Sequence, residues 1–233
     1  MRNAFIVGLA VVAAALLTWN LHTILLGLPD EARQDMIFRI IYFHVPGGII
    51  GLTGFGVGLA CSIVYLVKKN LWWDSLAASI TEVALAFALT NLVTGSIWGR
   101  QQWGVWWAWD ARLTGMLICC VVFVGYLMLR RAVEEPSQRA RLSAVVSIFG
   151  TVNAWFVYKA IDWFPRLQHP GAVLSFRTGG GRMDPVLEHP LFWNALALLC
   201  LAIIMVMVRI RQEAVSREID LLRRTAHASL RGL

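Results

Sequence analysis

Residues 191–210 read LFWNALALLCLAIIMVMVRI, and Arg209 is the one charged side chain in this stretch. A helix needs about 20 predominantly apolar residues to cross the hydrocarbon core of a bilayer. Five other runs of the chain have a similar length and character. The six predicted spans are residues 4–27, 46–67, 75–98, 113–133, 142–160 and 191–210. The sequence therefore predicts an all-α, polytopic membrane protein, with six transmembrane helices in a single membrane domain over residues 1–233.

The composition argues against an ordinary soluble domain and against a nucleic-acid-binding protein. The chain is 58% hydrophobic and only 15% charged, whereas soluble domains carry about 25% charged residues. Most of the basic residues behind the net charge of +7 fall on the side of the membrane that holds both termini. The positive-inside rule then predicts that both termini, including the tail 211–233, are cytoplasmic. We expect the lipid bilayer, and no nucleic acid, as a partner.

The first span begins after Arg2 in the manner of a signal peptide, but its length predicts a retained helix. Glu82 lies inside the third span, where a carboxyl group is costly unless it faces the bundle interior; a helix–helix contact is favoured over a functional role. The glycine-rich stretch 47–58 (GGIIGLTGFGVG) favours close helix packing. No C-x-x-C motif occurs, so the cysteines are interpreted as packing residues. These are Cys61, Cys119, Cys120 and Cys200.

Three connections are predicted on the outer side, at about 28–45, 99–112 and 161–190. The middle one contains WGVWWAWDARLT (103–114), with four tryptophans within seven residues. If residues 103–110 are helical, one face carries three of the tryptophans and an aspartate, and Gly104 allows something to approach the backbone closely. These four are Trp103, Trp106, Trp107 and Asp110, whereas Trp109 points elsewhere. An interfacial aromatic belt and a shelf for a large planar ligand both remain open.

Two histidines of the outer loops lie on short, stiff segments. In YFHVPGG, Pro46 suits the first turn of a helix, and Val45 before it is expected to be extended. His44 is therefore expected at the mouth of the second span. In RLQHPGA, His169 precedes a Pro-Gly turn. A porphyrin fits this setting, because it is flat and apolar and its iron commonly binds histidine.

The carboxylates at the edge of a porphyrin need cationic partners on the same side of the membrane. Arg112 and Arg39 are the arginines expected to pair with them, since guanidinium groups match carboxylates well. Glycine at 104 is included in the expected site because of the close approach that it permits.

At these residues the chain resembles a known family. The segment WGVWWAWDARLT resembles the WWD signature of haem-handling proteins in cytochrome c biogenesis. Together with RIIYFHVP (39–46), LVTGSIWG (92–99) and the six spans, it is similar to the cytochrome c maturation protein C family (CcmC, haem exporter protein C). The resemblance covers about residues 36–210, and its two central motifs are highly specific.

The resemblance implies a non-enzymatic protein that binds haem b on the periplasmic side of the bacterial inner membrane. It implies handover of that haem to the haem chaperone CcmE. It further implies a complex with the ATP-binding-cassette (ABC) pair CcmA/CcmB and the small one-helix subunit CcmD. Carried over by motif, the first axial ligand is His44. The shelf residues carried over in the same way are Trp103, Trp106, Trp107, Trp109, Asp110 and Arg112.

The second axial ligand transfers less directly. His169 is the expected iron ligand together with His44, but Gln168 separates it from the leucine that precedes the histidine in the family pattern. His189, in LEHPLFW at the start of the last span, is the rival.

Two other functions stay open. A cytochrome c synthase subunit shares the WWD segment but is longer, with additional histidines inside its helices, whereas here only His22 lies within a span. A membrane electron-transfer cytochrome b would need facing histidines at membrane depth. A transporter would show broken helices or charges near the midplane.

Overall fold

A computed structural model describes residues 2–31, 33–164 and 184–231, and all regular elements in these ranges are helical. Two short turns, the π-helical η1 (Thr23–Gly27) and the 3₁₀ turn η2 (Met36–Ile40), flank the first outer loop. The long helices are α1 (Arg2–His22), α2 (Ile41–Lys68), α3 (Leu71–Trp103), α4 (Ala111–Ala132), α5 (Pro136–Trp163) and α6 (Pro185–Arg231).

The prediction of an all-α protein with six helices is confirmed. Six helices of the described chain are long and apolar enough to cross a membrane. Most of them extend beyond the predicted spans. The largest extension is in α6, which continues unbroken for 47 residues and includes most of the charged tail. The mixed charges of that tail therefore belong to the same helix as the last apolar run.

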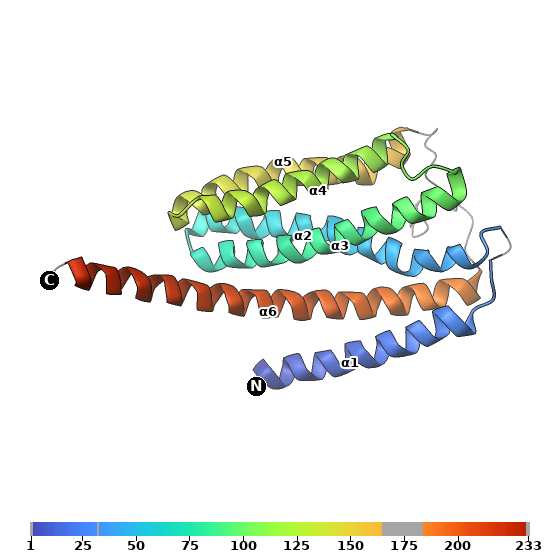
Figure 1. The fold of residues 1–233 in the computed structure, drawn as a ribbon, viewed down its shortest axis with the longest axis horizontal. Helices are drawn as coiled ribbons and strands as arrows, with labels where there is room; N and C mark the ends of the chain where they lie inside the picture. The colour runs from blue at the N-terminus through green and yellow to red at the C-terminus, as the bar shows by residue number, and fades with distance from the viewer. Residues whose placement is uncertain (1, 32, 165–183, 232–233) are drawn as a thin grey trace.

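The helices α2, α3, α4 and α5 pack as a group, with α6 along one side and α1 beyond α6 (Figure 1). Both ends of the chain point away from the end of the bundle where α3 connects to α4. We call the latter the tryptophan end; it comprises η2, the first turns of α2 and α6, and residues 104–110. The shared direction of the two termini agrees with an even number of crossings, whereas their cytoplasmic side stays a prediction.

Glycines of α2 allow this helix to lie directly against α3. A Cβ atom added at Gly51 would be 3.0 Å from the backbone nitrogen of Ala88, and one at Gly58 would be 2.6 Å from Oγ1 of Thr81. Side chains at these positions would push the two helices apart. The expectation that the glycine-rich stretch permits close packing is thus confirmed.

The centre of the bundle is an apolar cluster between α2, α3, α4 and α5. The rings of Phe55 and Phe123 stack with centroids 3.7 Å apart and planes 5° from parallel. Cys119 and Cys120 are buried in the same cluster, and all four cysteines are free thiols. Their predicted role as packing residues fits this burial.

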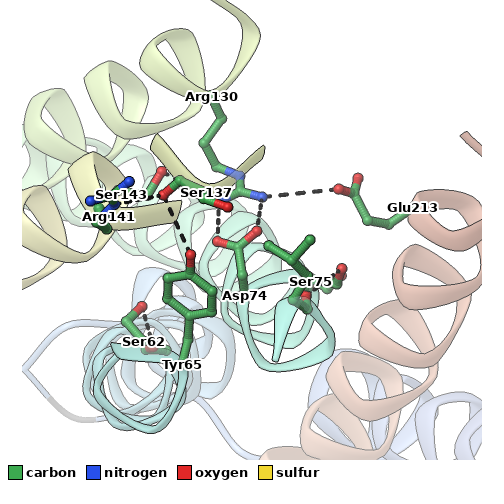
Figure 2. Close-up of polar contacts among 12 residues, drawn as sticks. Ser62, Tyr65, Asp74, Ser75, Arg130, Ser137, Arg141, Ser143 and Glu213 are labelled. Carbon is green, nitrogen blue, oxygen red and sulfur yellow. Dashed lines mark hydrogen bonds and ion pairs between the residues drawn. The ribbon is translucent and has the colours of Figure 1, made fainter. Parts of the chain in front are cut away.

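At the opposite end of the bundle, ion pairs and hydrogen bonds connect four helices (Figure 2). Arg130 of α4 donates to both carboxylate oxygens of Asp74 on α3, at 2.6 and 2.9 Å. Glu213 of α6 lies 3.9 Å from Arg130, and Ser143 of α5 accepts a hydrogen bond of 3.3 Å from it. Arg217 of α6 adds a hydrogen bond to a main-chain carbonyl at the start of α3. The long helix α6 is thereby fixed to the ends of its neighbours.

Glu82 is also explained by a helix–helix contact. Its carboxylate accepts hydrogen bonds from Nε and Nη2 of Arg209 on α6, at 2.9 and 2.5 Å. Both side chains are somewhat more than one-third exposed. The interhelical contact favoured from the sequence therefore exists, and it neutralises a carboxylate at membrane depth.

Candidate functional site

The tryptophan segment is an irregular loop between two helices. α3 ends at Trp103, and Gly104 follows it with a left-handed φ of 77°. A helix cannot continue through this conformation, which glycine adopts readily. Residues 104–110 are non-helical, and α4 begins after Asp110, whose side chain accepts a hydrogen bond of 2.8 Å from the Leu113 amide. The prediction of a short helix over 103–110, with one aromatic face, is therefore wrong.

The four tryptophans divide into two kinds. The side chains of Trp106 and Trp109 are 61% and 78% exposed. Trp103 and Trp107 are half-buried. Trp107 lies edge-on to Trp109, with ring centroids 5.9 Å apart. The segment thus presents two exposed indoles supported by two packed ones.

The last turns of α3 hold this segment in place. Oγ of Ser96 donates a hydrogen bond of 2.7 Å to the main-chain carbonyl of Trp106. The absence of a side chain at Gly99 makes room for the Trp103 ring, since an added Cβ would be 3.1 Å from it. Trp98 packs edge-on against Trp103, with centroids 5.2 Å apart. Residues of the motif LVTGSIWG therefore contact both the main chain of the tryptophan segment and the Trp103 ring.

The same turns contact the first outer loop. Nε1 of Trp98 donates a hydrogen bond of 2.7 Å to Oε1 of Gln34. Gln34 lies just before η2, which leads directly into α2. One end of α3 therefore positions both the tryptophan segment and the entrance to α2.

His44 lies inside the first turns of α2 and is half-buried. The helix begins at Ile41, so Val45 and Pro46 are both helical, and the expectation of an extended Val45 is wrong. Pro46 lacks the N–H that would bond to the carbonyl of Tyr42. That carbonyl instead accepts a hydrogen bond of 2.7 Å from Nδ2 of Asn194, a fully buried residue of α6. This side-chain contact explains how the helix passes through the proline.

The imidazole of His44 packs against α3. Its Nδ1 is 3.1 Å from Oγ1 of Thr94, and Nδ2 of Asn91 donates a hydrogen bond of 2.8 Å to the His44 carbonyl. A Cβ atom added at Gly95 would lie 2.8 Å from Cε1 of the ring. Asn91, Thr94 and Gly95 therefore orient the histidine, and they lie in the same last turns of α3 that contact the tryptophan segment.

The two candidate arginines have different surroundings. Arg39 forms an ion pair of 2.8 Å with Asp30 and donates a hydrogen bond of 3.0 Å to the Leu28 carbonyl. Its guanidinium is therefore already used to close the first outer loop. Arg112 lies in the first turn of α4, two residues after Asp110 and next to the tryptophan segment. Arg112 is consequently the better placed of the two for an anionic group.

Two buried polar atoms of the tryptophan segment have no hydrogen-bond partner in the described chain. They are Nε1 of Trp107, a donor, and Oδ2 of Asp110, an acceptor. A hollow of about 350 Å³ in the same segment is lined by Asp110 together with Val105, Ala108 and Trp109. Polar groups of this kind are normally satisfied in a native protein, which favours a ligand at this place.

Two histidines are candidates for the second ligand. His169 lies outside the described residues. The rival His189 is exposed at the start of α6, and its Nε2 accepts a hydrogen bond of 2.9 Å from Nε1 of Trp193. Within the described ranges no group of three or more His, Cys, Asp or Glu side chains is arranged to hold a metal ion.

Some site residues were missed from the sequence. Thr94, Gly95 and Asn91 contact His44, and Asn194 satisfies the carbonyl freed by Pro46. The motif LVTGSIWG is the sequence signal for Thr94 and Gly95, whereas Asn91 and Asn194 lie outside it.

Comparisons with known proteins find relatives that cover most of this chain. A family model described as "Heme exporter protein C" matches residues 1–225. The chain is 34% identical to "Heme exporter protein C" of Bradyrhizobium diazoefficiens over 82% of its length and 72% of that protein. It is 31% identical to the protein of that name in Paracoccus denitrificans, covering 89% of this chain and 84% of the relative. For Escherichia coli K12 the identity is 30%, over 78% and 73%.

Proposed function

Because the chain belongs to the heme exporter protein C family, we propose that it handles haem for cytochrome c maturation. In this proposal it binds haem b on the periplasmic side of the bacterial inner membrane and presents it to the haem chaperone CcmE. Haem is the cargo of the protein, and the chain itself makes and breaks no covalent bond.

The observation that carries the proposal is the joint support of His44 and the tryptophans. Thr94 and Gly95 contact the imidazole, while Ser96 on the next position holds the main chain of Trp106. One helical turn thus places a ring nitrogen that can bind iron beside a segment rich in exposed indoles. A planar apolar molecule with a central metal suits this combination, because histidine binds haem iron and aromatic rings stack on a flat apolar face.

The remaining groups of the segment fit the chemistry of haem. Trp106 and Trp109 offer exposed aromatic rings, and aromatic pairs contribute about 0.5–1.5 kcal/mol each beyond burial. Nε1 of Trp107 is a buried donor without a protein partner. Arg112 supplies the cation that a propionate would pair with. Asp110 fits haem less well, because its Oδ2 atom needs a hydrogen-bond donor and an ionised propionate has none.

For the second axial position we propose His169, as the family resemblance implies. His189 is less suited, because iron binding through its Nε2 would require the hydrogen bond from Trp193 to break. Two neutral imidazoles suit a carrier, since an incoming histidine of the chaperone can replace one of them while the tryptophans retain the ring.

The proposal includes a complex with the ABC-type CcmA/CcmB pair and the one-helix subunit CcmD. The description of the family as a heme exporter supports such an assembly. Several lipid-facing sides of the helices, for example on α1, carry large exposed apolar residues that a bilayer or further helices would cover.

The test is an absorption spectrum of the detergent-purified chain, expressed with ample haem and without the chaperone. We expect a six-coordinate low-spin haem that His44→Ala and His169→Ala each shift or abolish. His227→Ala is the matched control, because this residue lies near the far end of α6. A haem-free wild-type protein would refute the proposal, and an effect of His44→Ala alone would make His189 the second ligand to test.

A further inference from the structure

The hydroxyl of Thr94 can play only one role toward His44. Oγ1 of Thr94 donates its proton to main-chain carbonyls of α3, chiefly that of Thr90 at 2.6 Å, with that of Asn91 at 3.2 Å. A hydroxyl has a single hydrogen to donate. The contact of 3.1 Å between this oxygen and Nδ1 of His44 must therefore have the imidazole as the donor.

This assignment decides the tautomer of the ring. In a neutral imidazole one nitrogen carries the proton and the other carries the lone pair. When Nδ1–H donates to Thr94, the lone pair lies on Nε2. Metal-bound histidines commonly have this second hydrogen bond, which orients the ring and strengthens the ligand.

Two neighbours restrict the orientation of the same ring. Gly95 leaves space where any other residue would place a Cβ 2.8 Å from Cε1. The amide nitrogen of Asn91 lies 3.3 Å from both ring nitrogens, and it donates to the carbonyl of His44. This amide is equally distant from both ring nitrogens and therefore does not distinguish them, whereas the Thr94 hydroxyl contacts Nδ1.

We propose that Thr94 is a positioning residue that holds His44 as the Nδ1–H tautomer, so that Nε2 is the nitrogen that binds haem iron. The inference rests on the proposed function for its second half, the iron. Its first half, the tautomer, is a property of the haem-free protein. It also gives the motif LVTGSIWG a physical role: its Thr-Gly pair aims a histidine of the preceding helix.

The first experiment is ¹⁵N NMR of the haem-free chain, labelled at its histidine rings, in detergent. The His44 signal is assigned by its loss in His44→Ala. We expect the Nδ1–H pattern in the wild-type protein and in Thr94→Ser, which keeps the hydroxyl. Thr94→Val removes the acceptor at nearly constant shape, so we expect a mixture of tautomers. An Nε2–H tautomer in the wild-type protein, or a pattern unchanged by Thr94→Val, would overturn the inference.

The second experiment measures haem affinity of the same variants. Loss of such an outer contact commonly lowers metal affinity about 10–100-fold, so we expect at least a tenfold loss for Thr94→Val and wild-type behaviour for Thr94→Ser. Thr53→Val is the matched control, because its hydroxyl makes the same type of bond, to the Ile49 carbonyl of α2, and it is exposed. Far-ultraviolet circular dichroism verifies the fold of each variant.

The two proposals fail in different ways. If His44→Ala lowers haem binding but Thr94→Val leaves both tautomer and affinity unchanged, the role of Thr94 is wrong and the haem function stands. If Thr94→Val changes the tautomer while His44→Ala leaves haem binding intact, the haem role of His44 is wrong, and with it the claim that Nε2 binds iron.

Discussion

The guanidinium of Arg130 and the carboxylate of Asp74 form a two-pronged ion pair between α4 and α3, with side chains only 9% and 4% exposed. A carboxylate and an arginine so deeply buried are stable only as a pair, because each would otherwise lose its hydration without compensation. The pair also contacts Glu213 of α6, so it links three helices at the end of the bundle opposite the tryptophans.

Removal of either partner is therefore expected to destabilise the bundle strongly. Asp74→Asn leaves Arg130 with the longer contact to Glu213, and Arg130→Met leaves Asp74 with the longer contact to Arg217. Each buried charge is then poorly compensated, at a cost of up to about 3–5 kcal/mol. The double variant should lose less than the sum of the two, because neither charge is then left alone. The measurement is the free energy of unfolding in mixed detergent micelles.

The exposed pair Lys159–Asp162 supplies the control for that experiment. Its ion pair is 2.9 Å long but its carboxylate is 57% exposed, and surface pairs contribute about 0.2–1 kcal/mol. Asp162→Asn should therefore change the unfolding free energy far less than Asp74→Asn. Equal losses in the two variants would contradict the role assigned to the buried pair.

Asn194 and Pro46 are expected to be energetically coupled. Asn194→Leu leaves the buried carbonyl of Tyr42 without a donor, at about 1–3 kcal/mol. In a Pro46→Ala background the helix regains its own N–H for this carbonyl, so the same substitution should cost clearly less. A double-mutant cycle on unfolding free energies measures the difference. Additive effects would show that the carbonyl is satisfied in another way.

The sequence predicted the helices well because apolar runs of sufficient length have few alternatives to crossing a membrane as helices. The sequence predicted that Glu82 makes a helix–helix contact but did not identify Arg209 as its partner, because that pairing depends on how α3 and α6 pack. The contact between Tyr42 and Asn194 joins positions 152 residues apart. No local pattern marks such a pair before the packing is known.

The conformation of the tryptophan segment was not predicted correctly from its sequence. Periodicity placed Trp103, Trp106 and Trp107 on one helical face, but a single left-handed glycine at 104 ends the helix. From the sequence, this glycine is expected to give a ligand access to the backbone, whereas its left-handed conformation also ends the helix. Likewise the proline rule for Val45 failed, because a side chain from α6 satisfies the carbonyl that Pro46 leaves unpaired.

Gly51 and Gly56 offer a matched test of the packing between α2 and α3. Gly51→Ala would place a methyl group about 3.0 Å from the Ala88 backbone, and overpacking of this kind costs about 1–3 kcal/mol. Gly56 has no atom within 4 Å of an added Cβ. Gly56→Ala should therefore be neutral or stabilise the helix by up to about 1 kcal/mol. Unfolding free energies of the two variants check the prediction, and a loss in Gly56→Ala equal to that in Gly51→Ala would refute it.

Glu135 is expected to make the start of α5 sensitive to acid. Its carboxylate accepts main-chain hydrogen bonds from Ser137 and Gln138, and these bonds lower the pKa of Glu135 below its usual value. A lowered pKa in the folded state means that the stabilisation is present above the unfolded-state pKa and is lost as the pH falls through the folded-state value. The thermal unfolding midpoint of the wild-type protein should therefore decrease as the pH is lowered below about 4.3, the ordinary pKa of Glu. The decrease should be smaller in Glu135→Gln. Glu134→Gln, at the neighbouring exposed carboxylate, controls for the lost charge.

Trp109 provides the sharpest separation between a ligand shelf and an aromatic belt. It is 78% exposed beside the hollow at Asp110, whereas Trp72 is 50% exposed at the other end of α3. If Trp109 stacks on haem, its replacement by alanine removes about 0.5–1.5 kcal/mol of aromatic contact, a roughly two- to tenfold loss of affinity. The haem spectrum should keep its shape, because the axial ligands are untouched. Trp72→Ala should leave haem affinity unchanged, since a belt residue anchors the helix and contacts no haem. Haem titration of both variants decides between the two, and equal effects at both positions would favour the belt.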